Sequence, residues 1–400
     1  MPSPLPRSPS DTLPKPDGAA LAHTESCAAM LRSEIVRAGG WISFSRFMDL
    51  ALYATGLGYY AAGARKFGAD GDFVTAPEIS SLFGKTMANS IAAVLRQTGG
   101  DVLELGPGSG KLAKDVLLAL EEIGDDDVMP HRYCLLEVSA DLRARQHDAL
   151  ATLPASLAAR AEWLDALPEN FTGVIIANEV LDVIPVHLVG WHGGEEFERG
   201  VALCEGEFAW QDVPVANTEI AVRLETIRNK YLNSPPVEHY LTEIAPAVPG
   251  LVTSLAESLK HGALLLIDYG FRGAEYYHPS RDMGTLMCHY RHNAHPDPFL
   301  FPGLQDITAH VDFTVVANAG IGAGLDLAGY TTQANFLLAS GLTACLAAVD
   351  ARDTAKYLPL TNQVQRLVSP AEMGEFFKVI GFTRGNVSIP AFSTARALPL

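Results

Sequence analysis

Apolar and polar residues near the first quarter of the chain follow the pattern of a short strand, a glycine turn and a helix. The apolar stretch Val102–Leu105 carries one acid, and three glycines follow it at every second position, Gly106, Gly108 and Gly110. Apolar residues at helical spacing begin directly afterwards, at Leu112. Glycine permits positive φ and close approach of a ligand, and a helix start offers unpaired N–H groups. This stretch therefore predicts a loop that binds a cofactor.

Four further apolar stretches predict a parallel sheet around this first strand. They are Tyr133–Glu137, Ala161–Asp165, Gly173–Ala177 and Ala263–Ile267. Strands that alternate with helices indicate an α/β fold, in which ligands bind at the carboxyl ends of the strands. A closing strand is expected at about Thr383–Ser388, at the far edge of the sheet.

Helical spacing of apolar residues predicts the flanking elements. The expected helices cover about Leu21–Gly40, Ser43–Tyr53, Ser81–Leu95, Thr218–Tyr231, Val252–Lys260, Gln333–Ala348, Tyr357–Val368 and Pro370–Val379. The predicted organisation is a disordered, proline-rich leader at 1–20, a helical region at 21–98, the core at 99–270 with a β-meander insert at about 186–213, a lid or substrate-binding insert at 271–330, and a helical region with the closing strand at 331–400.

Acids at the tips of the first three strands are candidates for cofactor binding. Glu104 lies at the tip of the first strand, and Glu137 ends the second, about 30 residues past the glycines. Glu137 is placed to accept both ribose hydroxyls of a cofactor; the alternative is a solvent-facing helix cap, for which Ser139 is better suited. Asp165 ends the third strand and either accepts an adenine amino group or starts a turn.

Polar residues also follow the fourth strand. Asn178, Glu179 and Asp182 come directly after Gly173–Ala177, at the edge where an acceptor substrate should lie. The alternative is that Glu179 and Asp182 cap a short helix in solvent.

Thr75, Pro77 and Glu78 precede the helix at Ser81–Leu95 and are assigned to the cofactor side of the site. Local structure offers an alternative, because Thr75 or Ser80 can cap that helix and Pro77 and Glu78 are both favourable in a first helical turn. Capping does not explain why so many polar residues precede the glycine loop.

The spacing of the glycines separates three classes of cofactor loop. A P-loop needs four residues between its first glycine and a Gly-Lys pair followed by Ser or Thr, but three residues separate Gly106 from Gly110, and Leu112 follows Lys111. A dinucleotide fingerprint needs G-x-G-x-x-G, one residue more than the G-x-G-x-G found here. An acid followed by G-x-G-x-G resembles the first motif of the S-adenosylmethionine (SAM) methyltransferases. The Glu104 carboxylate would repel the phosphates of a nucleotide, whereas SAM carries no phosphates.

Composition narrows the functional classes. The chain has 400 residues, 48% of them hydrophobic, and a net charge of −17, which disfavours nucleic-acid binding and suits a cationic substrate or partner. Five scattered cysteines indicate a reducing compartment, and without a membrane-spanning run or a signal sequence a cytoplasmic protein is expected. His289, His292, His295 and His310 lack the spacing of a helical metal pair, so no metal is expected.

Six stretches of the chain are similar, in the same order, to the MidA-like methyltransferases, whose mitochondrial members assist assembly of respiratory complex I. They are Gly71–Phe83, Leu103–Lys111, Ala177–His187, Ile267–Gly270, Gly284–Tyr290 and Asp306–Phe313. All SAM methyltransferases share the glycine motif, whereas the first and last of these stretches are far more specific. The chain departs from the family at Val180-Leu181, where aromatic residues are frequent.

The resemblance implies a class I SAM-dependent methyltransferase, with a Rossmann-like seven-stranded sheet, an N-terminal helical part and inserted substrate-binding segments. It also implies S-adenosyl-L-methionine as cofactor and an arginine of a partner protein as acceptor, since the mitochondrial relatives dimethylate an arginine of a complex I subunit. Glu179 and Asp182, with Asn178 beside them, would then hold the guanidinium and take up its proton. The alternatives are a small-molecule methyltransferase and a SAM-binding assembly factor without turnover. The oligomeric state is open, with a homodimer as one option.

Overall fold

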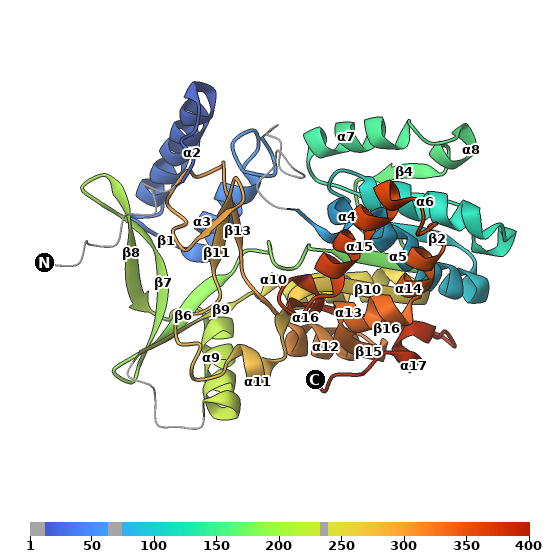
Figure 1. Ribbon diagram of the computed structural model, residues 1–400. Helices are drawn as coiled ribbons and strands as arrows, with labels where there is room; N and C mark the ends of the chain where they lie inside the picture. The colour runs from blue at the N-terminus through green and yellow to red at the C-terminus, as the bar shows by residue number, and fades with distance from the viewer. Residues whose placement is uncertain (1–12, 63–73, 233–238) are drawn as a thin grey trace, which may run out of the picture. The chain divides into compact units, whose positions relative to one another are not determined.

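The computed structural model describes residues 13–62, 74–232 and 239–400, which divide into two compact units (Figure 1). The first unit comprises Met1–Phe73, Val183–Pro246 and Ala274–His310, and the second comprises Val74–Asp182, Ala247–Gly273 and Val311–Leu400. The predicted insert at 271–330 is therefore divided, with 274–310 in the first unit and 311–330 in the second. Most of the predicted leader, 1–12, and the motif residues Gly71–Phe73 lie outside the described residues.

The second unit is organised around a sheet in which the described residues form eight strands. Seven strands follow the order β15 (Asp326–Thr332), β16 (Phe377–Arg384), β10 (Leu259–Phe271), β5 (Phe171–Asn178), β2 (Asp101–Leu105), β3 (Tyr133–Leu136) and β4 (Ala161–Leu164), while β14 (Val311–Asp312) pairs with β10. β16 is antiparallel to β10 and β15, and the five strands from β10 to β4 are parallel. The strand order reverses between β2 and β5, which is where α/β sheets of this kind bind ligands.

Helices cover both faces of this sheet. α5 (Ser81–Thr98) and α6 (Lys111–Ile123) pack over one face, in the same buried cluster as Val102, Val174 and Leu265. On the other face, α12 (Phe313–Gly322) lies so close to β16 that a Cβ on Gly320 would lie 2.5 Å from the ring of Phe382. α10 (Ala247–Ser258) packs against α12 and β10. Strands that are covered on both faces carry continuous apolar runs, as the sequence shows for β5 and β10.

Shorter helices complete the second unit. They are α4 (Ala76–Ile79), the 3₁₀ turn η1 (Asp126–Val128), α7 (Ala140–Leu150), α8 (Ala155–Ala158), α13 (Gln333–Ala339), α14 (Leu342–Ala347), α15 (Thr354–Val368), α16 (Met373–Phe376) and α17 (Pro390–Thr394). The helix predicted at Gln333–Ala348 is interrupted at Gly341, whose φ is 93°.

Two predicted elements near the C-terminus are wrong. The segment Pro370–Val379 contains only the short helix α16, and the closing strand is β16, which begins six residues before the predicted Thr383. All residues of β16 except the last are buried. A strand that is buried on both faces has no regular alternation of apolar and polar residues, so periodicity alone does not distinguish it from a buried helix.

The first unit contains two antiparallel sheets. The larger consists of β1 (Trp41–Ser43), β7 (Glu195–Cys204), β6 (His187–His192), β9 (His239–Ile244) and β8 (Glu207–Pro214), and the smaller of β12 (Asn293–His295), β11 (Met287–Tyr290) and β13 (Asp306–Thr308). β6, β7 and β8 form the meander predicted at about 186–213. The helices are α2 (Gly18–Arg37), α3 (Phe44–Tyr53), α9 (Thr218–Tyr231) and α11 (Gly273–Tyr276).

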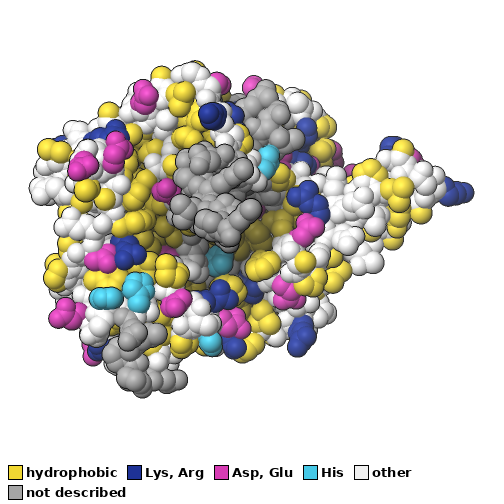
Figure 2. Space-filling model, turned by 60° about the vertical axis from the view of Figure 1, so that its left-hand side comes forward, with side chains coloured by type: hydrophobic (Ala, Val, Ile, Leu, Met, Phe, Trp, Pro, Cys, Tyr) yellow, Lys and Arg dark blue, Asp and Glu magenta, His cyan; other side chains and the backbone are white. Residues whose placement is uncertain are grey.

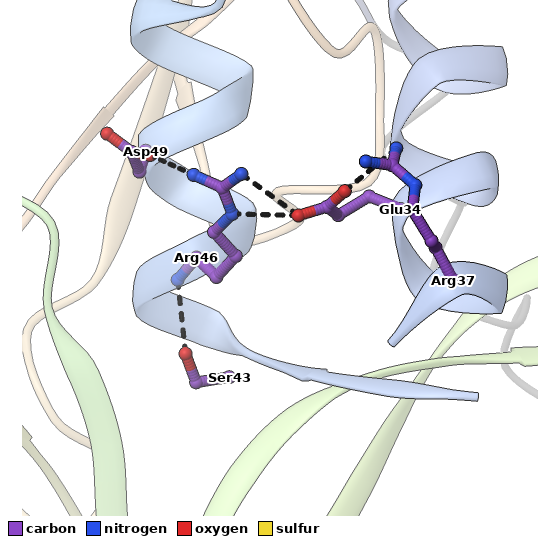
Figure 3. Close-up of polar contacts among 5 residues, drawn as sticks. All are labelled: Glu34, Arg37, Ser43, Arg46 and Asp49. Atoms are coloured by element: carbon purple, nitrogen blue, oxygen red, sulfur yellow. Dashed lines mark hydrogen bonds and ion pairs between the residues drawn. The ribbon is translucent and has the colours of Figure 1, made fainter. Parts of the chain in front are cut away.

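Side-chain caps begin α2 and α3, and an ion pair links the two helices (Figure 3). α2 begins at Gly18, inside the predicted leader, because Asp17 accepts a hydrogen bond from Ala20 N at 2.9 Å. Ser43 caps α3 as predicted. Glu34 on α2 pairs with Arg46 on α3 at 2.9 Å, but exposed pairs of this kind add little to stability.

Figure 2 shows acidic, basic and hydrophobic side chains interspersed over the displayed face. In the part of the chain that the structure describes, no helix has the length and apolar character of a membrane span. All five cysteines are free thiols. Within the same described residues, no group of three or more His, Cys, Asp or Glu side chains has an arrangement that could hold a metal ion.

Candidate functional site

The glycine loop between β2 and α6 has a left-handed backbone at each of its three glycines. φ is 57° at Gly106, 53° at Gly108 and 80° at Gly110. A Cβ on Gly106 would lie 2.9 Å from Cγ2 of Val180, and one on Gly110 would lie 3.2 Å from Cα of Gln146. The loop therefore requires glycine both for its backbone conformation and for its close packing.

Glu104 of β2 is buried and bonds to the neighbouring strand. Its side chain is 3% exposed, and the hydroxyl of Tyr133 on β3 donates to its Oε2 at 2.6 Å. Burial raises the pKa of Glu104 to about 7, although the hydrogen bond from Tyr133 opposes the rise. The strand-tip acid is thus held inside the sheet and is partly protonated near neutral pH.

Glu137 and Asp165, both predicted to face the cofactor, have different surroundings. Glu137 is 8% exposed; its Oε1 accepts the N–H of Ser139 at 2.8 Å, and its Oε2 accepts the side-chain amide of Gln146 at 3.1 Å. Glu137 is therefore not a solvent-facing cap, and Ser139 caps α7 instead. The Asp165 side chain is 87% exposed and pairs with Arg143 at 2.5 Å. Contact of Asp165 with adenine stays a prediction.

Helix α4 connects the glycine loop to the residues that follow β5. Ser109 in the loop donates its hydroxyl to Glu78 on α4. At the start of the same helix, the N–H of Ala76 donates to Oε1 of Glu179 at 3.3 Å. One short helix thus contacts both the predicted cofactor side and the predicted acceptor side of the site.

Helix capping accounts for part of the polar segment before α5. Ser80 accepts a hydrogen bond from Leu82 N at 3.2 Å and caps α5, and Pro77 is buried in the first turn of α4. Thr75 occupies the N-cap position of α4 without a side-chain capping bond. Its hydroxyl is therefore not used for capping, and its predicted role toward a cofactor stays open.

Three carboxyl groups and one amide lie together at the carboxyl ends of β5 and β10. Asn178 ends β5 and donates its side-chain N–H to Oε1 of Glu179 at 3.0 Å; Glu179 itself has a left-handed φ of 55°. Asp268 on β10 is fully buried, and its Oδ2 accepts the backbone N–H groups of residues 180–182 at 3.2, 2.8 and 3.3 Å. Asp268 thereby fixes the turn that carries Asp182, which is 5% exposed.

The electrostatics of this acidic cluster favour protonated carboxyl groups. Burial raises the pKa of Glu179 to about 8, and the charge of Asp182 adds to the rise. Burial also holds the pKa of Asp268 well above its usual range, with the charges of Asp182 and Glu179 as further causes. The hydrogen bonds described above for Glu179 and Asp268 come from amide groups, not from Lys or Arg. A bound cation would relieve the repulsion, so the cluster is suited to holding one.

The structure adds contacts that the sequence does not identify. Asp268 directly follows the predicted strand Ala263–Ile267, so its place at the ligand edge is predictable, but its hydrogen bonds to residues 180–182 are not. Tyr133 and Gln146 lie inside a strand and a helix, where nothing in the local pattern marks them as partners of Glu104 and Glu137.

Residues 83–331 match the model of a family described as an S-adenosyl-L-methionine-dependent methyltransferase. The mitochondrial protein arginine methyltransferase NDUFAF7 homolog of Caenorhabditis elegans is 28% identical over 330 residues, which cover 75% of this chain and 73% of that protein. The mitochondrial protein arginine methyltransferase NDUFAF7 of Homo sapiens is 25% identical over 382 residues, which cover 86% of this chain and 80% of that protein.

Two crystal structures from Burkholderia thailandensis are similar over nearly the whole chain. One, bound to S-adenosyl-homocysteine, is 49% identical with a TM-score of 0.90 and covers 96% of this chain and 98% of its own. A native structure is 48% identical with a TM-score of 0.87 and the same coverage. The chain therefore belongs to the family of S-adenosyl-L-methionine-dependent methyltransferases, and its second unit has the α/β fold of that class.

Proposed function

We propose that this methyltransferase transfers a methyl group to an arginine side chain of a partner protein. The acidic cluster of the half-buried Glu179 with the buried Asp182 and Asp268 carries this proposal, because a guanidinium stays charged and presents paired N–H donors that match carboxylates. Oδ1 of Asn178 is also buried and, among the residues that the structure describes, has no hydrogen-bond partner, so it offers one more acceptor.

The residues around the glycine loop fit SAM as the methyl donor. The loop 106–110 lies at the reversal of strand order, presents backbone without Cβ atoms at three positions, and is followed by the buried carboxylate of Glu137 at the tip of β3. We assign the ribose hydroxyls to Glu137. The other proposed cofactor residues are Glu104, Asp165, Thr75, Pro77 and Glu78. When bound, SAM supplies a methyl group on a positively charged sulfur, which leaves as a neutral thioether.

Gly106→Ala is expected to weaken binding of S-adenosyl-homocysteine by about 10-fold or more, because its Cβ would strain the left-handed backbone and press on Val180. Isothermal titration calorimetry checks this result. Gly124→Ala is the matched control: Gly124 has a φ of 68°, and a Cβ there would meet nothing within 4 Å. The control should lose a similar amount of stability and keep its affinity. Equal affinities in both variants would contradict the assignment of the loop.

Glu179 and Asp182 would act on the acceptor. Carboxylates paired with one side of the guanidinium draw positive charge away from the nitrogen that attacks the methyl group. That nitrogen forms a bond to the methyl carbon and loses an N–H proton, which the Glu179 carboxylate accepts. The left-handed φ of Glu179 and its hydrogen bonds from Asn178 and Ala76 hold the carboxylate in place before the acceptor arrives.

The raised pKa of Glu179 predicts a pH dependence of acceptor use. Only the ionised carboxylate can pair with the guanidinium and accept its proton, and the free enzyme has a pKa of about 8 at this group. kcat/KM for the acceptor should therefore rise about tenfold per pH unit up to about pH 8 and then level off. A profile that is flat from pH 6 to pH 9, measured at saturating SAM, would contradict the role of Glu179.

A protein acceptor is supported by the curated relatives, which are named protein arginine methyltransferases, and by the net charge of −17, which favours a cationic partner. Within this class, the resemblance described above suggests a subunit of respiratory complex I as the candidate acceptor.

Labelled SAM tests the proposal. The protein is incubated with labelled SAM and extract from a strain that lacks it, and modified proteins are identified by mass spectrometry. Methylarginine on one protein is expected. Label found only in small molecules would replace the proposal with a small-molecule methyltransferase. No transfer despite measurable SAM affinity would replace it with a SAM-binding assembly factor without turnover.

A further inference from the structure

Gln146 on α7 contacts two parts of the proposed cofactor site at once. It is fully buried, and its side-chain Nε2 donates to the carbonyl oxygen of Gly108 at 2.9 Å and to Oε2 of Glu137 at 3.1 Å. Its Oε1 accepts a hydrogen bond from Nε1 of Trp163 on β4 at 2.9 Å. One amide group therefore bridges the glycine loop, the tip of β3 and the neighbouring strand β4.

The direction of this amide is set by chemistry. An indole N–H can only donate, so the oxygen of Gln146 must face Trp163 and its NH₂ group must face Gly108 and Glu137. The ring of His147 stacks on Trp163 with 3.6 Å between ring centroids. The chain Trp163–Gln146–Glu137 thus has one hydrogen-bonding direction, and it ends on the carboxylate assigned to the ribose hydroxyls.

We propose that Gln146 is a positioning residue for cofactor binding, which holds the glycine loop and Glu137 in fixed register so that both meet the adenosyl part of the cofactor together. This inference rests on the proposed cofactor site. The NH₂ group of Gln146 restrains the Glu137 carboxylate and the Gly108 carbonyl, and the indole of Trp163 prevents the amide from turning over. A binding site held in place before the ligand arrives loses less entropy on binding.

A role in core packing alone is the competing explanation, because the side chain is fully buried. Two substitutions separate the explanations. Gln146→Met keeps an unbranched side chain of similar length and removes every hydrogen bond. Gln146→Glu keeps the shape and replaces the NH₂ donor with an oxygen that repels both Gly108 O and Glu137. When protonated, the introduced carboxyl regains one donor, so its defect should depend on pH.

Calorimetric titration of the full chain with S-adenosyl-homocysteine tests the inference. At pH 8, both Gln146 variants should bind about 10- to 100-fold more weakly than wild type, the range for loss of a hydrogen bond to a charged group. At pH 5.5, the ratio to wild type should shrink for Gln146→Glu and stay constant for Gln146→Met. Gln365→Glu, at an exposed position on α15, controls for the added charge and should bind like wild type.

The titrations test the proposed cofactor site and the role of Gln146 separately. Wild-type protein that does not bind S-adenosyl-homocysteine refutes the proposed cofactor site, independently of Gln146. Folded Gln146 variants with wild-type affinity, or a Gln146→Glu defect that is equal at both pH values, refute the positioning role. If both variants fail to fold, Trp163→Phe decides, because it keeps an aromatic ring beside His147 and releases the amide. About 3- to 10-fold weaker binding is then expected, and unchanged binding overturns the inference.

Discussion

Glu179→Gln is expected to lower kcat for methyl transfer by about 100- to 1000-fold, while the affinity for S-adenosyl-homocysteine stays within about twofold. The amide oxygen of Gln can still accept the hydrogen bonds from Asn178 and Ala76, so the local structure should persist. What the variant loses is the carboxylate that pairs with a guanidinium and accepts its proton. Single-turnover kinetics with the methylated protein identified by mass spectrometry, together with calorimetry, measure the two quantities separately.

Glu257→Gln is the matched control for this substitution, because Glu257 is exposed on α10 and the exchange is chemically the same. The control should retain wild-type kcat. If Glu179→Gln methylated the true acceptor at the wild-type rate, Glu179 would have no part in transfer. A parallel loss of S-adenosyl-homocysteine affinity would instead place Glu179 on the cofactor side.

The same substitution should stabilise the protein at high pH. Glu179 has a pKa of about 8 in the folded protein, against its ordinary value of 4.5, so the folded state holds this proton more tightly than the unfolded state does. The destabilisation is absent below about pH 4.5, grows as the pH rises and is complete above about pH 8. Glu179→Gln removes this cost, which is on the order of 5 kcal/mol at full ionisation. Unfolding midpoints should therefore rise at pH 9 and change little at pH 5, so the carboxylate needed for function is also a source of instability.

Local patterns in the sequence predict elements whose boundaries depend on local interactions. Thr218–Tyr231 is predicted with its observed bounds, since Asn217 directly before it caps the helix. β16 is not predicted correctly, because its neighbours β10 and β15 lie far away in the chain and cover it on both sides. The division of 271–330 between the two units also depends on contacts between distant segments. β15, which starts within this segment, joins the sheet by pairing with β16, a strand that comes much later in the chain.

The candidate site is predictable where function places acids at strand ends, and unpredictable where it depends on contacts between distant segments. Glu137, Glu179 and Asp182 follow apolar strands, so a parallel sheet brings them to one edge. Gln146 meets Gly108 and Trp163, which lie 38 and 17 residues away in the chain. No pattern of local spacing encodes such a contact, and it becomes visible only when the strand order is known.

Asp268→Ala should lower kcat for methyl transfer by about 100-fold or more and destabilise the fold, whereas Asp268→Asn should have smaller effects on both. Alanine leaves the three backbone N–H groups of residues 180–182 without their acceptor, at a cost of about 3 kcal/mol, and frees the turn that carries Asp182. Asparagine can direct its oxygen to those N–H groups, at the cost of losing the bond from Tyr269 N and facing that N–H with its NH₂ group. It also removes a buried carboxyl group that is repelled by its neighbours.

The two variants together decide what Asp268 does. If it acts by holding the turn, Asp268→Asn keeps kcat within about 10-fold of wild type and Asp268→Ala loses about 100-fold or more, with unfolding midpoints in the same order. If Asp268 itself bound the guanidinium, the neutral asparagine would lose as much activity as alanine while keeping its stability. Asp326→Ala, at an exposed position that starts β15, controls for loss of a surface carboxylate and should change neither property. If kcat falls in the same order as the unfolding midpoints across this series, Asp268 on β10 shapes the acceptor side of the site by holding the turn after β5, which carries Glu179 and Asp182.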